Sequence, residues 1–179
     1  MKSRTPLVIG IVVAVIVIIA VVAVVIAGGG DDSEEVVVAP PLVGQDYAGN
    51  EVEVVPGEDG PLMLVFLAHW CPHCNAEIPV LQQWEASGEI PEDLDIIGIS
   101  TAVTADRPNY PPDEWLETMG WEWPVIADDD GTLAETYGVN AFPYMVFVGD
   151  DGAVTATVSG EQPISQLQTL ADAAVGASA

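Results

Sequence analysis

The hydrophobic and polar positions of the chain predict strands and helices that alternate from residue 43 onward. Short apolar runs bounded by glycine, asparagine or aspartate are typical of strands, and apolar residues at every third or fourth position are typical of helices. The predicted strands lie at residues 43–55 (a hairpin broken at 48–50), 62–68, 94–100, 123–126, 144–148 and 153–158. The predicted helices lie at residues 72–86, 111–119, 132–137 and 164–175. This order predicts an α/β fold, with a central mixed β-sheet flanked by helices on both faces.

A different pattern precedes these elements. Residues 7–27 contain no charged side chain and consist almost entirely of valine, isoleucine and alanine. As a helix they would be about 31 Å long, close to the thickness of the hydrocarbon core of a bilayer, so we predict a transmembrane helix. Lys2 and Arg4 precede it, which predicts cytoplasmic residues 1–6 and an exported C-terminal part. A cleaved signal peptide is the alternative, but its apolar region is normally shorter, at about 7 to 15 residues.

The charge of the chain changes at the end of the apolar segment. All 28 acidic residues lie at or beyond Asp31, where Arg107 is the only basic residue, so this part carries a formal charge of −27. Such a charge repels nucleic acid and anionic lipid headgroups, and we expect neither as a partner. Residues 28–41, three glycines followed by an acidic stretch, predict a flexible linker to a domain at residues 42–176.

The two cysteines of the chain, Cys71 and Cys74, are separated by two residues where a predicted strand gives way to a predicted helix. Unpaired backbone N–H groups and the positive end of the helix dipole favour a thiolate at a helix N-terminus. Because the thiolate is the attacking species in disulfide exchange, we expect Cys71 to form a mixed disulfide and Cys74 to resolve it. The expected redox group is therefore a Cys71–Cys74 disulfide, with no metal and no organic cofactor.

Structural uses of the pair fit the sequence less well. A disulfide that closes so short a loop constrains the unfolded chain little. A structural zinc site normally has four ligands, and the four candidates, His69, Cys71, His73 and Cys74, lie within six residues. That spacing is too tight for ordinary tetrahedral coordination, so redox chemistry is the better interpretation.

Two landmarks resemble the thioredoxin superfamily. Residues 66–74, Phe-Leu-Ala-His-Trp-Cys-Pro-His-Cys, resemble its strand–Trp-Cys-x-x-Cys–helix core, and residues 138–143, Gly-Val-Asn-Ala-Phe-Pro, resemble the loop that ends in a cis-proline. The continuation at 75–79, Asn-Ala-Glu-Ile-Pro, is similar to membrane-anchored extracytoplasmic thioredoxins of the TlpA/ResA type. The resemblance runs from about residue 41 to 174 and implies a thioredoxin-like fold with an added N-terminal edge hairpin and a central insertion.

The resemblance also implies roles for individual residues. Cys71 would be the exposed nucleophile and Cys74 the buried resolving cysteine, with Trp70 packed beside the disulfide. Pro143 would follow a cis peptide bond. The backbone around Phe142 would then pair with an extended segment of the substrate.

Four other residues near the cysteines are candidate modulators or proton carriers. Glu77 matches a helix glutamate that assists proton transfer in the TlpA/ResA branch, and its alternative is an ordinary solvated helix residue. Pro72 and His73 form a dipeptide that is characteristic of the DsbA-type oxidases. A nearby imidazole stabilises the Cys71 thiolate and thereby makes the protein a stronger oxidant. His69 either adds to this effect or replaces a small residue at the end of the strand.

These features predict an extracytoplasmic, membrane-anchored thiol:disulfide oxidoreductase. We expect it to act on cysteine-containing exported proteins and to be recycled by a membrane redox partner. The Pro-His dipeptide favours oxidation while the TlpA/ResA resemblance favours reduction, so the sequence leaves the direction open. Two alternatives are a copper-binding metallochaperone and a thiol peroxidase like the peroxiredoxins. The peroxidase chemistry expects a threonine shortly before the cysteine, where residues 65–68 have none.

Overall fold

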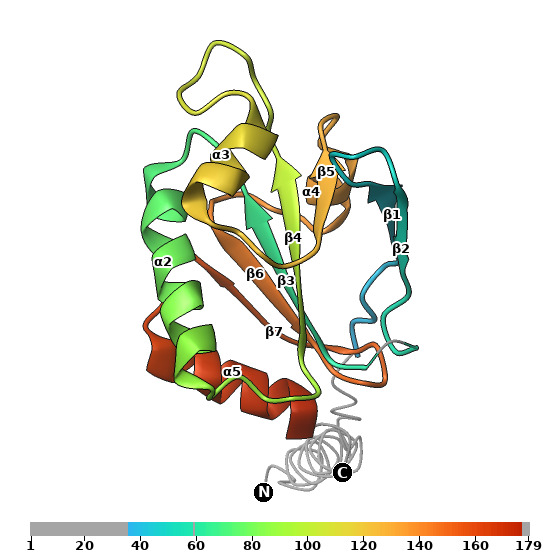
Figure 1. Ribbon diagram of the computed structural model, residues 1–179. Helices are drawn as coiled ribbons and strands as arrows, with labels where there is room; N and C mark the ends of the chain where they lie inside the picture. The colour runs from blue at the N-terminus through green and yellow to red at the C-terminus, as the bar shows by residue number, and fades with distance from the viewer. Residues whose placement is uncertain (1–35, 59, 177–179) are drawn as a thin grey trace, which may run out of the picture. The chain divides into compact units, whose positions relative to one another are not determined.

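A computed structural model describes residues 36–58 and 60–176 of the chain (Figure 1). Within these residues seven strands form one sheet, in the order β2-β1-β5-β4-β3-β6-β7. The strands are β1 (Leu42–Gln45), β2 (Glu51–Val54), β3 (Leu62–Leu67), β4 (Asp95–Thr101), β5 (Val125–Asp128), β6 (Tyr144–Val148) and β7 (Val154–Ser159). The helices are α2 (Pro72–Ser87), α3 (Pro112–Met119), α4 (Thr132–Thr136) and α5 (Ile164–Gly176).

The centre of the sheet is parallel and its edges are antiparallel. β3 pairs in parallel with β4, and β4 with β5, because the connections through α2 and α3 return the chain to the same end of the sheet. β6 runs antiparallel to β3 and forms a hairpin with β7. At the opposite edge, β1 and β2 form a hairpin that joins the sheet through β5. The predicted mixed α/β sheet with an N-terminal edge hairpin is confirmed.

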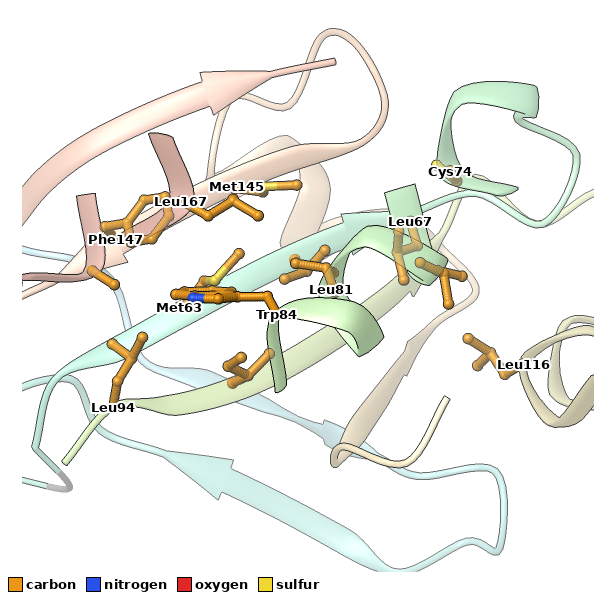
Figure 2. Packing of buried hydrophobic residues seen from close by; sticks show 14 of the residues in the cluster. Met63, Leu67, Cys74, Leu81, Trp84, Leu94, Leu116, Met145, Phe147 and Leu167 are labelled. Atoms are coloured by element: carbon orange, nitrogen blue, oxygen red, sulfur yellow. The ribbon is translucent and has the colours of Figure 1, made fainter. Parts of the chain in front are cut away.

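Helices cover both faces of this sheet. Successive residues of β3 point to opposite faces and so belong to two different core clusters. One cluster packs against α2, α3 and α5, and it includes Ile78, Leu81 and Trp84 on the face of α2 that the helical spacing predicts to be buried (Figure 2). The other cluster packs against α4 through Leu133. The packing of α2 against the sheet therefore fixes the position of the N-terminus of α2, where the cysteines lie.

Residues before 42, within the stretch predicted as a linker, make backbone hydrogen bonds to the sheet. The Ala39 N–H donates to the Gly152 carbonyl over 2.9 Å, and the Val154 N–H donates to the Val37 carbonyl over 2.7 Å. The segment around these two residues therefore pairs with the chain at the start of β7. The sequence pattern did not predict this pairing because it depends on unpaired backbone groups at a sheet edge, which side-chain periodicity does not report.

The predicted features of the N-terminal part lie outside the described residues. They are the cytoplasmic residues 1–6, the transmembrane helix at 7–27 and the linker up to residue 35, and they stay predictions. In the part that the structure describes, no helix is long and apolar enough to cross a bilayer.

Gly98, in the middle of β4, is closely approached by an aromatic ring. A Cβ atom at this position would lie 2.7 Å from Cζ2 of Trp121, whose ring also packs edge-on against Trp123. The Trp121 ring lies between Gly98 and Trp123, so it cannot easily move away from an added methyl group. We therefore expect Gly98→Ala to lower the free energy of unfolding by about 1 to 3 kcal/mol, measured by urea denaturation. Gly176→Ala is the control, since a Cβ at Gly176 meets no atom within 4 Å. Equal stability of the two variants would contradict the prediction.

Candidate redox site

Cys71 lies at the junction between β3 and α2. It is the N-cap of α2, with φ −82° and ψ 120°, and Pro72 follows at the first helical position, where its missing N–H costs nothing. The Cys71 N–H donates to the Ala68 carbonyl over 2.9 Å, and its carbonyl accepts from the Asn75 N–H over 3.2 Å. The backbone thus places the Cys71 sulfur at the N-terminus of the helix, as the sequence predicts.

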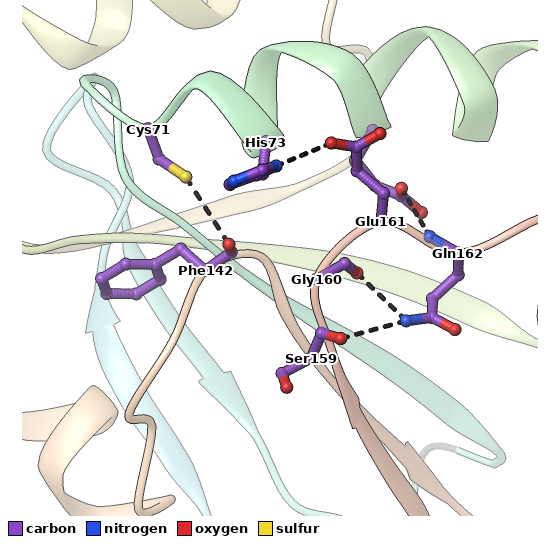
Figure 3. A network of polar contacts seen from close by, with 8 residues as sticks. Cys71, His73, Phe142, Ser159, Gly160, Glu161 and Gln162 are labelled. Atoms are coloured by element: carbon purple, nitrogen blue, oxygen red, sulfur yellow. Dashed lines mark hydrogen bonds and ion pairs between the residues drawn. The ribbon is translucent and has the colours of Figure 1, made fainter.

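Cys71 is less exposed than the resemblance implied. The residue is only 5 % exposed, because it packs into the core cluster together with Trp70 and Phe142. Its thiol points to the Phe142 carbonyl at 3.6 Å (Figure 3). Cys71 therefore lies beside this aromatic pair and is not on an open surface.

Cys74 lies one turn further along α2 and is completely buried. Both cysteines are free thiols in the structure. Burial raises the pKa of Cys74 far above its usual range, and the hydrogen bond and charge of Cys71 raise it further. Cys74 is therefore a thiol at neutral pH, and it becomes a nucleophile only when another group accepts its proton.

The loop before β6 faces the cysteines. The Phe142–Pro143 peptide bond is cis, which confirms what the resemblance implied. The ring of Phe142 stands at 88° to that of Trp70, with ring centroids 6.0 Å apart, and the Trp70 Nε1–H donates to the Ala102 carbonyl over 2.9 Å. Trp70 is therefore fixed on both edges beside Cys71, in the position that the sequence predicts.

Glu77 is buried inside the domain, three residues after Cys74 on the same helix. Its Oε2 accepts a hydrogen bond from the Gln162 N–H over 2.9 Å, and its Oε1 has no hydrogen-bond partner among the described residues. Burial raises the pKa of Glu77 to about 7, and repulsion by Glu161 adds to the rise, whereas the Gln162 N–H lowers it. These contacts exclude the interpretation of Glu77 as an ordinary solvated residue.

His73 is exposed and forms an ion pair that the sequence did not predict. Its Nδ1 lies 2.7 Å from Oε1 of Glu161, a residue 88 positions further along the chain (Figure 3). The Glu161 carboxylate therefore lies beside the imidazole that the sequence places within the cysteine motif.

His69 is completely buried, and both of its ring nitrogens bind the loop at residues 104–108. Its Nδ1 donates to the Pro108 carbonyl over 2.7 Å, and its Nε2 accepts from the Thr104 N–H over 3.3 Å. The Asn109 side chain donates to the His69 carbonyl over 2.8 Å. One donating and one accepting ring nitrogen is the pattern of a neutral imidazole. These contacts support a structural role for His69; whether it also modulates Cys71 stays a prediction.

Three consecutive residues between β7 and α5 each contact a different part of the site. The contacts join the Gly160 N–H to the Pro143 carbonyl at 2.8 Å, the Glu161 carboxylate to His73, and the Gln162 N–H to the Glu77 carboxylate. This segment, residues 160–162, therefore connects the cis-proline loop, the cysteine motif and the buried acid. No motif or spacing in the sequence indicates it.

No group of three or more His, Cys, Asp or Glu side chains within residues 36–58 and 60–176 is arranged to hold a metal ion. The chemistry that the described site supports is carried by the two thiols, the buried carboxyl and the backbone around them.

Comparison with known proteins gives one family and several relatives. The model of the AhpC/TSA family matches residues 37–157. The thiol-disulfide oxidoreductase ResA of Bacillus thuringiensis subsp. konkukian is 26 % identical over 129 residues, which cover 72 % of each chain. The structure of MTB DsbF is 25 % identical with a TM-score of 0.62, covering 75 % of this chain and 95 % of that one. A thiol:disulfide interchange protein of the thioredoxin family from Chlorobium tepidum, 19 % identical with a TM-score of 0.64, shares the fold over 78 % of this chain and 97 % of that one.

Proposed function

Because the chain belongs to the AhpC/TSA family within the thioredoxin superfamily, we propose that it exchanges disulfides with cysteine-containing exported proteins, as a thiol:disulfide oxidoreductase of the TlpA/ResA type. The observation that carries the proposal is the pair of thiols at the start of α2. Cys71 lies at the helix N-terminus facing the Phe142 carbonyl, and Cys74 is buried behind it.

In the reducing direction the reaction has two steps. The Cys71 thiolate attacks a substrate disulfide, a new S–S bond forms, and one substrate sulfur leaves as a thiolate. Cys74 then attacks the Cys71 sulfur of this mixed disulfide, which releases the second substrate sulfur and leaves Cys71 and Cys74 joined. The oxidising direction is the reverse of these steps, and it starts from the Cys71–Cys74 disulfide.

The second step needs a proton acceptor for Cys74. Cys74 is buried, and burial holds it in the thiol form. Glu77 is one turn away on the same helix, and its pKa of about 7 leaves it able to take up or release a proton near neutral pH. We assign to Glu77 the role of accepting the Cys74 proton during reduction of a substrate and of returning it in the reverse reaction.

The proposal also includes a cellular location and a partner that recycles the cysteine pair. The apolar residues 7–27, with Lys2 and Arg4 before them, support a membrane anchor with the domain on the extracytoplasmic side. There the dithiol or disulfide needs a membrane redox partner to restore it after each turnover.

The proposed function is tested with the purified full-length chain and glutathione. We expect Cys71 and Cys74 to equilibrate reversibly with the glutathione pair, and the chain to catalyse insulin reduction, oxidative refolding of a reduced protein, or both. A reduction potential of the Cys71–Cys74 pair of about −120 mV would indicate that the protein acts as an oxidant, and one of about −270 mV that it acts as a reductant. Peroxide reduction faster than disulfide exchange would favour the peroxidase alternative. Copper retained at one ion per reduced chain would favour the metallochaperone.

His73→Gln is expected to make the protein more reducing. The substitution removes an imidazole that stabilises the Cys71 thiolate, and it leaves the Glu161 carboxylate unpaired beside the site, which disfavours the thiolate further. We expect the equilibrium with glutathione to shift about tenfold towards the Cys71–Cys74 disulfide, which corresponds to about 30 mV. Gln83→His, which places an imidazole at an exposed position further along α2, is the control. An unchanged potential in His73→Gln would show that His73 does not influence the cysteines.

A further inference from the structure

Arg107 is the only lysine or arginine in the described part of the chain, and it lies at the redox site. Its guanidinium carbon is 5.1 Å from the centroid of the Trp70 ring, within the range of a cation–π contact. Trp70 directly precedes Cys71. The one lysine or arginine of the described residues therefore lies over the tryptophan that precedes Cys71.

The guanidinium of Arg107 has no carboxylate partner among the described residues. The one ion pair found there joins His73 and Glu161. Arg107 affects the neighbouring acid Asp106 only slightly. The pKa of Asp106 is lowered mainly by its hydrogen bond with Thr104, and Arg107 contributes to a lesser degree. The Asp106 Oδ1 accepts the Thr104 hydroxyl at 2.6 Å. In a domain rich in carboxylates, the guanidinium donors thus stay available to a partner.

The loop that carries Arg107 is held in place by the residues around it. His69 binds the Pro108 carbonyl and the Thr104 N–H, so the backbone is anchored on both sides of Arg107. The Arg107 N–H donates to the Thr104 carbonyl over 3.3 Å, which closes a turn just before the residue. Asn109 adopts a φ of 63°, a left-handed conformation that its side-chain hydrogen bond to the His69 carbonyl supports. The cation is therefore presented from an anchored loop.

We propose that Arg107 binds a carboxylate of the substrate segment that lies across Cys71, so that the protein prefers cysteines with a nearby aspartate or glutamate. This inference rests on the proposed disulfide exchange and adds the chemistry of the preferred substrate. A guanidinium can bind a carboxylate through two parallel hydrogen bonds, and its stacking on Trp70 limits the conformations that must be lost on binding. An acid within about three residues of the cysteine, about 10 Å of extended chain, is within reach.

The surrounding charge makes this contact selective. Apart from Arg107, the Lys, Arg, Asp and Glu side chains beyond residue 30 are all carboxylates, and they repel an acidic segment that docks away from Arg107. A substrate with one acid beside its cysteine is therefore attracted at the site itself. A lysine in the same place would lie against the guanidinium and be disfavoured by like charge.

The test compares disulfide-containing peptides that differ only in a glutamate, glutamine or lysine next to the cysteine. With the full-length wild-type chain we expect kcat/KM to be about three- to tenfold higher for the glutamate than for the glutamine peptide, as for an exposed charge-assisted contact. In Arg107→Gln this ratio should fall to about one. Arg107→Lys should give an intermediate ratio, because the ammonium group keeps the positive charge but lacks the planar pair of N–H donors that binds a carboxylate through two hydrogen bonds.

Gln83→Glu is the matched control, since it makes the same change in net charge at an exposed position on α2 away from Cys71. We expect it to leave the glutamate-to-glutamine ratio as in the wild type. A ratio that Arg107→Gln does not change, or that Gln83→Glu changes equally, would overturn the inference while leaving disulfide exchange intact. Failure of the wild-type chain to react with any of the peptides would overturn the proposed function itself.

Discussion

Cys71→Ser is expected to abolish both insulin reduction and oxidative refolding. A hydroxyl cannot form the mixed disulfide through which exchange proceeds, and Cys74 is buried and held as a thiol, so it cannot replace Cys71 as the attacking group. We expect a loss of about 10³-fold or more, to the rate of the uncatalysed exchange. The measurement is the initial rate in each assay at equal protein concentration.

Cys74→Ser is the informative partner of this variant. It keeps the attacking thiol but lacks the resolving one, so we expect a mixed disulfide between Cys71 and the substrate to accumulate. Non-reducing electrophoresis and mass spectrometry detect this species directly. Activity that persists in Cys71→Ser, or the absence of a trapped species in Cys74→Ser, would contradict the order of attack that the structure supports.

Glu77→Gln is expected to slow the resolution of the mixed disulfide by about 10²-fold, a common contribution of general acid–base catalysis. The amide cannot accept the Cys74 proton, whereas the first attack by Cys71 does not require that transfer. Stopped-flow measurement of both steps should therefore show a slower second step and a first step close to that of the wild type. Glu85→Gln, at an exposed position of the same helix, is the control. An equal effect on both steps would contradict this role.

The same substitution has a predictable effect on stability. The pKa of Glu77 is about 7 in the folded protein and 4.5 as its usual value, so the folded state binds more protons between these two pH values. The stabilisation is complete below the lower value and is lost as the pH rises through the higher one. Glu77→Gln has no carboxyl to titrate here and lacks this pH dependence. As the pH rises from 5 to about 8, the free energy of unfolding of the wild type should fall relative to that of Glu77→Gln, by at most about 3 kcal/mol. Urea denaturation at both pH values measures the difference.

The pairing of His73 with Glu161 bears on the direction of the reaction. The Pro-His dipeptide by itself favours a stable thiolate and hence an oxidant. The Glu161 carboxylate, 2.7 Å from the imidazole, is part of the same electrostatic environment. The measured potential and its change in His73→Gln together separate the contribution of the dipeptide from that of the rest of the site.

The amino-acid sequence by itself determined the order of the elements and the location of the redox pair. Both are local properties. β3 is a continuous apolar run, α2 buries side chains at helical spacing, and Cys71 and Cys74 lie at the boundary between them. The cis peptide before Pro143 followed from a short motif that the family shares. Such features are readable because a few neighbouring residues are enough to specify them.

Only the tertiary structure decided what surrounds that pair. Glu161 meets His73 and the Gln162 N–H meets Glu77 across 85 or more residues of sequence, so no spacing along the chain indicates either contact. The burial of Glu77, which raises its pKa, depends on packing rather than on the residue type. Arg107 appeared in the sequence only as an isolated basic residue among acids. Its position over Trp70 exists because the fold brings an anchored loop to the cysteine motif, and long-range packing of this kind is what local patterns do not contain.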